Sequence, residues 1–136
     1  MSRIYIDAGA WIGLAVRRDA HHPAAQRFFE EHLADQFVTS NLVLAEIFTF
    51  CRYRRHNREA RQIHALMQQT EQQGRLEVVW VTREIHESAW EIYDRYDDQA
   101  FSFTDCSSFV IARRENVDFV FGFDADFRIM GFDLRP

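Results

Sequence analysis

Four acidic residues stand where a folded chain could gather them for metal chemistry. In the stretch SFTDCSSFVIARRENVDFVFGFDADF (residues 102–127), Asp105 lies near an expected helix start, and Asp124 follows an apolar run typical of a strand. Asp7 ends the first apolar run of the chain, and Glu46 interrupts the apolar segment NLVLAEIFTF. Carboxylate oxygens suit magnesium or manganese better than zinc or copper. If the fold brings these acids together, they predict a divalent-cation site able to hydrolyse a nucleic-acid phosphodiester.

The elements that must position these acids follow from hydrophobic periodicity and helix signals. Strands are expected at residues 3–7, 37–40, 76–81, 118–122 and 132–135. Helices are expected from Ala10, over 22–35, 41–55 and 57–74, from Thr82, and over 105–116, with Asn41, Asn57 and Thr104 as helix caps. Alternating strands and helices predict an α/β fold with a largely parallel sheet covered on both faces, formed by residues 1–136 as one domain. Such sheets place their sites outside the carboxyl ends of the strands, where Asp7 and Asp124 stand.

Glu46 is the most informative acid, because the pattern of its helix predicts burial in the middle of the fold. A buried carboxylate is costly unless it is paired, protonated or bound to a metal. No basic residue lies within one turn of Glu46, but an arginine from elsewhere could reach it. By itself, Glu46 therefore fits a structural partner as well as a metal.

The composition excludes several mechanisms. All sixteen basic residues are arginine, and the absence of lysine rules out Schiff-base catalysis and a Walker phosphate loop. Cys51 and Cys106 lack the spacing of a zinc or redox site and are expected to be buried free thiols. No apolar run is long enough for a signal peptide or a membrane span, which predicts a cytoplasmic protein that does not contact a membrane.

The net charge of −5 argues against nonspecific coating of nucleic acid. Any contact with nucleic acid must then be local. The segment RYRRHNREAR (residues 52–61) carries five arginines that could meet phosphates or simply form a solvated helix end.

The motifs YIDAGAWIGL, TSNLVLAEIF, SFTDCSSFVIA and FGFDADF occur in the order and approximate spacing of the four acidic motifs of PIN-domain proteins. Over about residues 4–134, the chain resembles this family and especially its VapC-type toxin ribonucleases. The resemblance implies a three-layer α/β/α endoribonuclease in which Asp7, Glu46, Asp105 and Asp124 hold one or two Mg²⁺ or Mn²⁺ ions. It also implies an RNA substrate, a cognate antitoxin that blocks the cleft, and a homodimer, for which the apolar helices between Asn41 and Gln73 offer a surface.

Three positions depart from the family pattern. Ala8 and Gly122 stand where hydroxyl residues often support the acids, and Ala100 stands where relatives tend to have an acid. Loss of such supporting contacts commonly lowers metal affinity or activity about 10–100-fold. These departures keep open a non-catalytic PIN-like interaction module, and the apolar strand before Asp124 suggests a phosphatase as a third hypothesis, although its usual lysine is missing.

Two secondary expectations concern neighbouring residues. Asp126 could be a further metal ligand or could cap the turn DADFRIM. The aromatic residues Phe28, Phe29 and Tyr93 are expected in the core or in a dimer contact rather than in a base-stacking platform.

Overall fold

The computed structural model describes residues 1–136, and its centre is a five-stranded sheet. The strands are β1 (Arg3–Ile6), β2 (Gln36–Ser40), β3 (Leu76–Val79), β4 (Phe119–Phe121) and β5 (Leu134–Arg135). Their spatial order is β3-β2-β1-β4-β5, and every neighbouring pair is parallel. All carboxyl ends therefore point to the same edge of the sheet.

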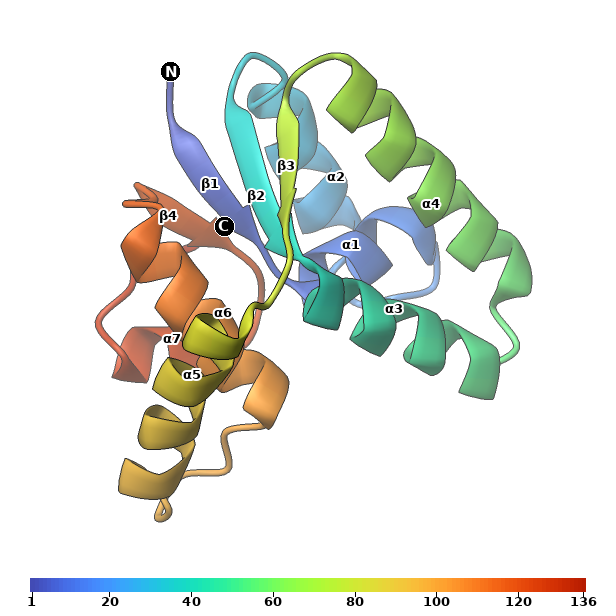
Figure 1. Cartoon of the computed structure of the whole chain (residues 1–136). Coiled ribbons are helices and arrows are strands. Elements are labelled where there is room, and N and C mark those ends of the chain that lie inside the picture. The colour runs from blue at the N-terminus through green and yellow to red at the C-terminus, as the bar shows by residue number, and fades with distance from the viewer.

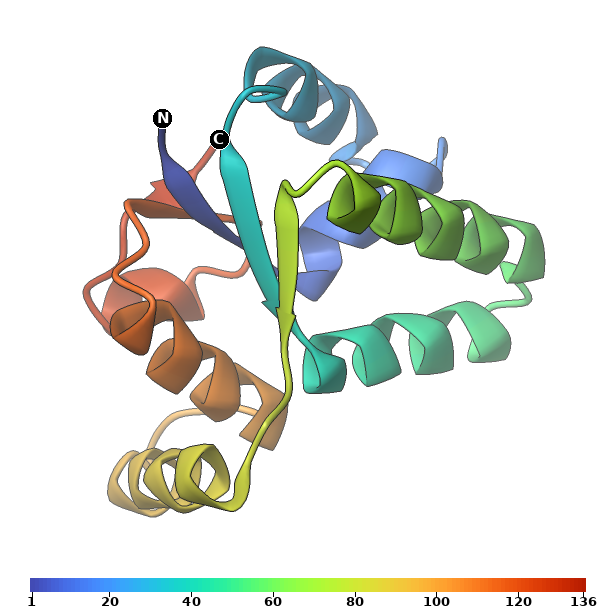
Figure 2. The ribbon, with the colours of Figure 1, turned by 45° about the horizontal axis from the view of Figure 1, so that its top comes forward.

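Seven helices complete the chain and cover both faces of the sheet. They are α1 (Ala8–Ala15), α2 (His22–Glu31), α3 (Asn41–Tyr53), α4 (Asn57–Gln72), α5 (Arg83–Arg95), α6 (Phe103–Arg114) and α7 (Asp126–Ile129). Figures 1 and 2 show α1, α2 and α4 together on one side of the sheet and α5, α6 and α7 on the other. The predicted three-layer α/β/α fold with a parallel sheet is confirmed. None of the helices combines the length and the apolar character needed to cross a bilayer.

The core is built on the two central strands, because helices cover both of their faces. Ile4, Tyr5 and Ile6 of β1 are fully buried, and so are Val120 and Phe121 of β4. Strands buried on both faces need a continuous apolar sequence rather than an alternating one, and RIYI and FVF have it. Cys51 and Cys106 are buried free thiols, as predicted.

The helix caps differ from those expected. Ser40 rather than Asn41 caps α3, with its hydroxyl accepting a bond from the Val43 amide. The Asn41 side chain instead accepts a bond from the Val81 amide, 40 residues away. His56 precedes α4 without a side-chain cap bond, so the predicted cap at Asn57 is also wrong. In both helices, the residue at the cap position is the one immediately before the residue that we predicted.

The predicted burial of α3 is wrong for much of the helix. Val43, Ile47 and Cys51 are buried, but Ala45, Glu46 and Tyr53 are exposed. The reason is that α3 packs against α1, α4 and α6 and contacts only β2 of the sheet, so one face of the helix is left uncovered (Figure 1). An apolar sequence alone could not show that one face of this helix has no packing partner.

Candidate metal centre

Asp7 and Asp124 lie side by side because they follow adjacent parallel strands. Asp7 comes directly after β1, and its backbone amide donates to the Phe121 carbonyl of β4 at 3.0 Å. Asp124 is the third residue after β4. From β1 the chain adds β2 and β3 on one side of the sheet, and it then adds β4 and β5 on the other side of β1. The strand order therefore reverses between β1 and β4. Ligands of open α/β sheets bind at such a switch point.

Asp105 is held at the start of α6 by a reciprocal capping box. Its backbone amide donates to the Ser102 hydroxyl at 3.0 Å, and its carboxylate accepts from the Ser102 amide at 2.9 Å. Ser102 is therefore the cap of α6, and the assignment of that role to Thr104 was wrong. These two bonds fix the Asp105 backbone and one of its carboxylate oxygens, and the carboxylate remains partly exposed at the cleft.

Asp126 joins Asp105 and Asp124 in one group. One carboxylate oxygen from each of the three residues lies within 4.8 Å of the other two. Asp124 accepts a bond from the Asp126 amide at 2.9 Å, so Asp124 rather than Asp126 orders the turn before α7. The geometry favours the ligand interpretation of Asp126 over the capping one.

Glu46 also faces this group: the residue as a whole is exposed on α3, but its carboxyl group is partly shielded from water. Burial and, after it, the charges of Asp105 and Asp124 raise the pKa of Glu46, and a hydrogen bond with the Thr104 hydroxyl partly offsets this rise. None of the ion pairs of the molecule includes Glu46, which removes the structural arginine partner that the sequence left open. Five acids from four separate segments thus meet at one edge of the sheet.

Asp7, Glu46, Asp105 and Asp126 have pKa values above the ordinary value of a carboxyl group. Burial, followed by the nearby charges of Asp105, Glu46 and Asp124, raises the pKa of Asp7 from 3.8 to about 7. Burial first and neighbouring carboxylates second also raise the pKa values of Glu46, Asp105 and Asp126. No arginine pairs with any of these acids, so the protein itself supplies no compensating charge.

The donor set fits a hard divalent cation. It consists of carboxylate oxygens, and the group contains neither cysteine nor histidine. Mg²⁺ and Mn²⁺ prefer such oxygens, with water completing the coordination. A cation would relieve the repulsion that raises the pKa values in its absence.

Comparison with known proteins agrees with this arrangement. The family model of the PIN domain matches residues 4–133. The chain belongs to the PIN-domain family. The 23S rRNA-specific endonuclease VapC20 of Mycobacterium tuberculosis is 33% identical over 134 residues, which span 98% of each protein. The crystal structure of that VapC20, a sarcin–ricin loop cleaving toxin, matches with a TM-score of 0.87 and covers 98% of this chain and 99% of its own.

More distant structures share the fold. VapBC2 from Rickettsia felis matches with a TM-score of 0.67 at 12% identity, covering 98% of this chain and 97% of that chain. FitAcB from Neisseria gonorrhoeae matches with a TM-score of 0.69 at 12% identity, covering 98% and 96%. The predicted resemblance to VapC-type toxins is confirmed by the VapC20 match.

In this PIN domain, Gly122 lies close against the first acid. A Cβ atom placed on Gly122 would lie 3.3 Å from the Asp7 Cβ and 3.9 Å from its Oδ2. A larger residue here would require Asp7 or the backbone to shift by a few tenths of an ångström, and glycine supplies no hydroxyl to the Asp7 carboxylate. Ala8 begins α1 and is buried, so it offers no hydroxyl either. Asp7 thus depends on backbone groups for hydrogen bonds.

A buried hydroxyl pair beneath the cluster was missed in the sequence. The Tyr5 and Ser108 hydroxyls lie 2.7 Å apart, and both residues are fully buried. Tyr5 stands two residues before Asp7 on the same face of β1, and Ser108 stands one turn after Asp105 on α6. Their bond joins the strand and the helix that carry two of the acids. The positions of Tyr5 and Ser108 relative to Asp7 and Asp105 were visible in the sequence. The hydrogen bond between two residues 103 positions apart was not.

Replacing Tyr5 with phenylalanine tests this link. We expect the free energy of unfolding to fall by about 1–3 kcal/mol, because the Ser108 hydroxyl is left buried without a partner. The double variant Tyr5→Phe/Ser108→Ala should lose less than the sum of the two single changes. Chemical denaturation measures all four proteins, and strictly additive losses would show that the two hydroxyls act independently.

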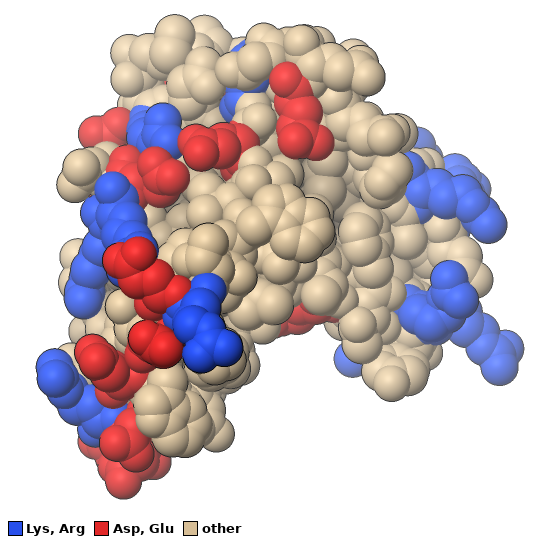
Figure 3. All heavy atoms as spheres, in the orientation of Figure 1, with Lys and Arg blue, Asp and Glu red and all other residues tan.

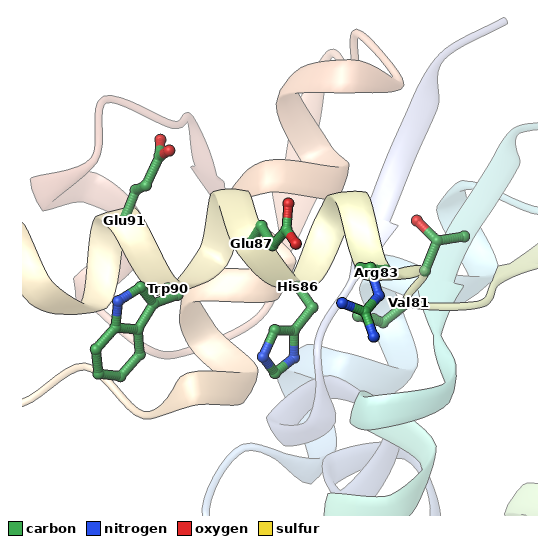
Figure 4. Close-up of a pocket in the computed structure, with 7 residues that line it drawn as sticks. Val81, Arg83, His86, Glu87, Trp90 and Glu91 are labelled. Carbon is green, nitrogen blue, oxygen red and sulfur yellow. The ribbon is translucent and has the colours of Figure 1, made fainter.

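A hollow of about 750 Å³ lies along α5, and none of the five acids lines it. Figure 4 shows His86 and Trp90 on one side of the helix and Glu87 and Glu91 on the other. Trp90 is 54% exposed and stacks on Tyr93, with 5.5 Å between ring centroids. Of the two places expected for the aromatic residues, the core and a dimer contact, Phe28 lies in the core, whereas the exposed Tyr93 does not.

Proposed function

We propose that this protein is an endoribonuclease that hydrolyses RNA phosphodiester bonds at the acidic cluster and serves as the toxin of a toxin–antitoxin pair. The observation that carries the proposal is the meeting of five unpaired carboxylates in a chain 33% identical to an rRNA-specific endonuclease. The alignment with that relative spans 98% of this chain, including the segments that carry all five acids.

Each acid has a distinct part in this proposal. Asp105, Asp124 and Asp126 hold a Mg²⁺ or Mn²⁺ ion, because their oxygens already converge. Asp7 and Glu46 complete the site from β1 and α3. A bound ion of this kind polarises a phosphate and lowers the pKa of a water molecule. The capping box holds Asp105 in place, so that the ligand set needs little reorganisation.

The proposed partners follow from the same comparison. The substrate is RNA, and by analogy with VapC20 a structured ribosomal RNA loop is the first one to test. A cognate antitoxin covers the acidic cleft, and the protein works in the cytoplasm. We also propose a homodimer, for which the exposed Trp80 and Trp90 provide apolar surface.

Mapping cleavage sites tests the proposed function. The purified protein is incubated with total RNA in Mg²⁺, in Mn²⁺ and in EDTA, and new RNA ends are located by primer extension. We expect cuts at a few defined positions with either ion and none in EDTA, because the carboxylates alone supply no nucleophile.

Two other outcomes would point elsewhere. Mg²⁺ binding without cleavage of any RNA would favour the non-catalytic interaction module, which Ala8 and Gly122 suggest. Release of phosphate from small phosphate esters without RNA cleavage would favour the phosphatase.

A further inference from the structure

Arginines from separate segments gather at one end of the molecule. The structure brings Arg17 and Arg18, which follow α1, next to Arg58, one of the five arginines that run from the end of α3 into α4. Arg17, Arg18 and Arg58 line one hollow of about 290 Å³. We call the whole group the arginine surface. Its members are Arg17, Arg18, Arg52, Arg54, Arg55, Arg58 and Arg61, all of them exposed.

The charges of the arginine surface are not neutralised by the protein. None of its members forms an ion pair with an acid. The nearest acid in the hollow, Glu59, is bonded to His56 at 3.0 Å. Figure 3 shows basic side chains at the right-hand end of the molecule with no acidic ones among them, whereas the opposite lobe mixes both. A protein with net charge −5 thus concentrates nearly half of its arginines here.

One member occupies a costly backbone position. Arg55 has a φ of 58° in the connection between α3 and α4. This left-handed conformation favours glycine and is strained for a residue with a side chain. An arginine therefore stands where glycine would fold more easily, which gives a way to remove the charge without harming the fold.

The arginine surface is connected to the acidic cluster along α3. Arg52 lies six residues after Glu46, about 9 Å further along the helix axis. Glu46, Phe50 and Arg54 are spaced by four residues and share one face, and the Arg54 guanidinium lies 4.9 Å from the centre of the Phe50 ring. A strand leaving the acids along this face would meet positive charge within a few nucleotides.

RNA binding needs such a surface. Five carboxylates repel a polyanion, and a cation bound among them offsets that repulsion only locally. We propose that the arginine surface binds backbone phosphates of the RNA that the acidic cluster cleaves; this inference rests on the proposed function. A second copy of the chain does not fit there, because two such surfaces would repel each other.

Salt-dependent binding tests the proposal. All proteins carry Asp105→Asn, so that RNA is bound and not cut. The probes are a fluorescein-labelled hairpin of the sarcin–ricin loop and an unrelated hairpin of equal length. The test variants are Arg58→Ala/Arg61→Ala, Arg17→Ala/Arg18→Ala and Arg55→Gly. The matched control is Arg27→Ala/Arg95→Ala, which removes two exposed arginines without ion pairs from α2 and α5.

We expect each double test variant to bind both hairpins about tenfold more weakly near 0.15 M salt, because phosphate contacts do not depend on base sequence. The slope of log affinity against log salt should become shallower by about 0.7–0.9 for each lost contact. Arg55→Gly should lose about half as much affinity and keep or raise the melting temperature. The control pair should match the parent protein.

The inference would be overturned if the test pairs and the control pair bound RNA with the same affinity and the same salt dependence. The same result is expected if the arginines bind an acidic protein instead of RNA. Cleavage by the protein with an intact Asp105 is measured separately. RNA cuts by that protein together with unchanged binding in the test variants would reject the arginine surface and leave the proposed function standing. Absence of cuts would reject the proposed function whatever the binding result.

Discussion

Asp105→Asn is expected to lower the rate of RNA cleavage by about 10³-fold or more. Asp105 offers an oxygen within 4.8 Å of those of Asp124 and Asp126, and asparagine replaces a charged ligand with a neutral one. Loss of a few kcal/mol of transition-state stabilisation corresponds to a change of this size. The fold should persist, because the asparagine oxygen can still accept the bond from the Ser102 amide. Single-turnover cleavage of a labelled RNA measures the loss.

Two matched changes separate chemistry from stability. Ser102→Ala removes the hydroxyl that caps α6 and should cost about 1 kcal/mol of unfolding free energy while retaining the carboxylate. Asp94→Asn removes an exposed carboxylate of α5 that is not part of the cluster. It should change neither the rate of RNA cleavage nor the free energy of unfolding. Cleavage by Asp105→Asn within tenfold of the unmodified protein would exclude Asp105 as a ligand that the reaction requires.

Asp7→Asn is expected to inactivate the enzyme and, in EDTA, to make it more stable at neutral pH. The pKa of Asp7 rises from 3.8 to about 7 in the fold, mainly through burial, which corresponds to about 4 kcal/mol. Near pH 4 the folded protein keeps this carboxyl protonated at little cost. As pH rises from about 4 to 7, the unfolded chain releases the proton more readily, so folding stability falls. Above pH 7 the folded carboxylate is charged as well, and the loss is complete.

Asparagine has no proton to release and avoids this loss. The melting temperature of Asp7→Asn should therefore match the parent near pH 4 and exceed it by roughly 10–15 °C at pH 8. Mg²⁺ should narrow the gap at pH 8 by stabilising the parent protein. Calorimetry over this pH range, with Asp94→Asn as the control, measures both effects. A gap independent of pH would mean that Asp7 is not destabilised by its surroundings.

Much of the fold was predictable from local pattern. The runs at residues 3–7 and 118–122 identified β1 and β4 within one residue at each end, because strands buried on both faces need unbroken apolar sequence. The order of strands and helices then led to a parallel sheet with its acids at one edge. Helix starts were less predictable. Ser40 and Asn41 are both good caps, and Ser40 is the cap because the Asn41 side chain accepts a hydrogen bond from the distant Val81 amide.

The sequence by itself determined the chemistry of the site: five carboxylates, no lysine, and motifs in a fixed order along the chain. The tertiary structure decided which groups meet. It placed Glu46 at an exposed position on α3, joined Tyr5 to Ser108 beneath the acids, and brought Arg17 and Arg18 to Arg58. The physical reason is range. Periodicity and capping depend on neighbours within about a turn, whereas burial and charge compensation depend on segments that meet only when the chain has folded.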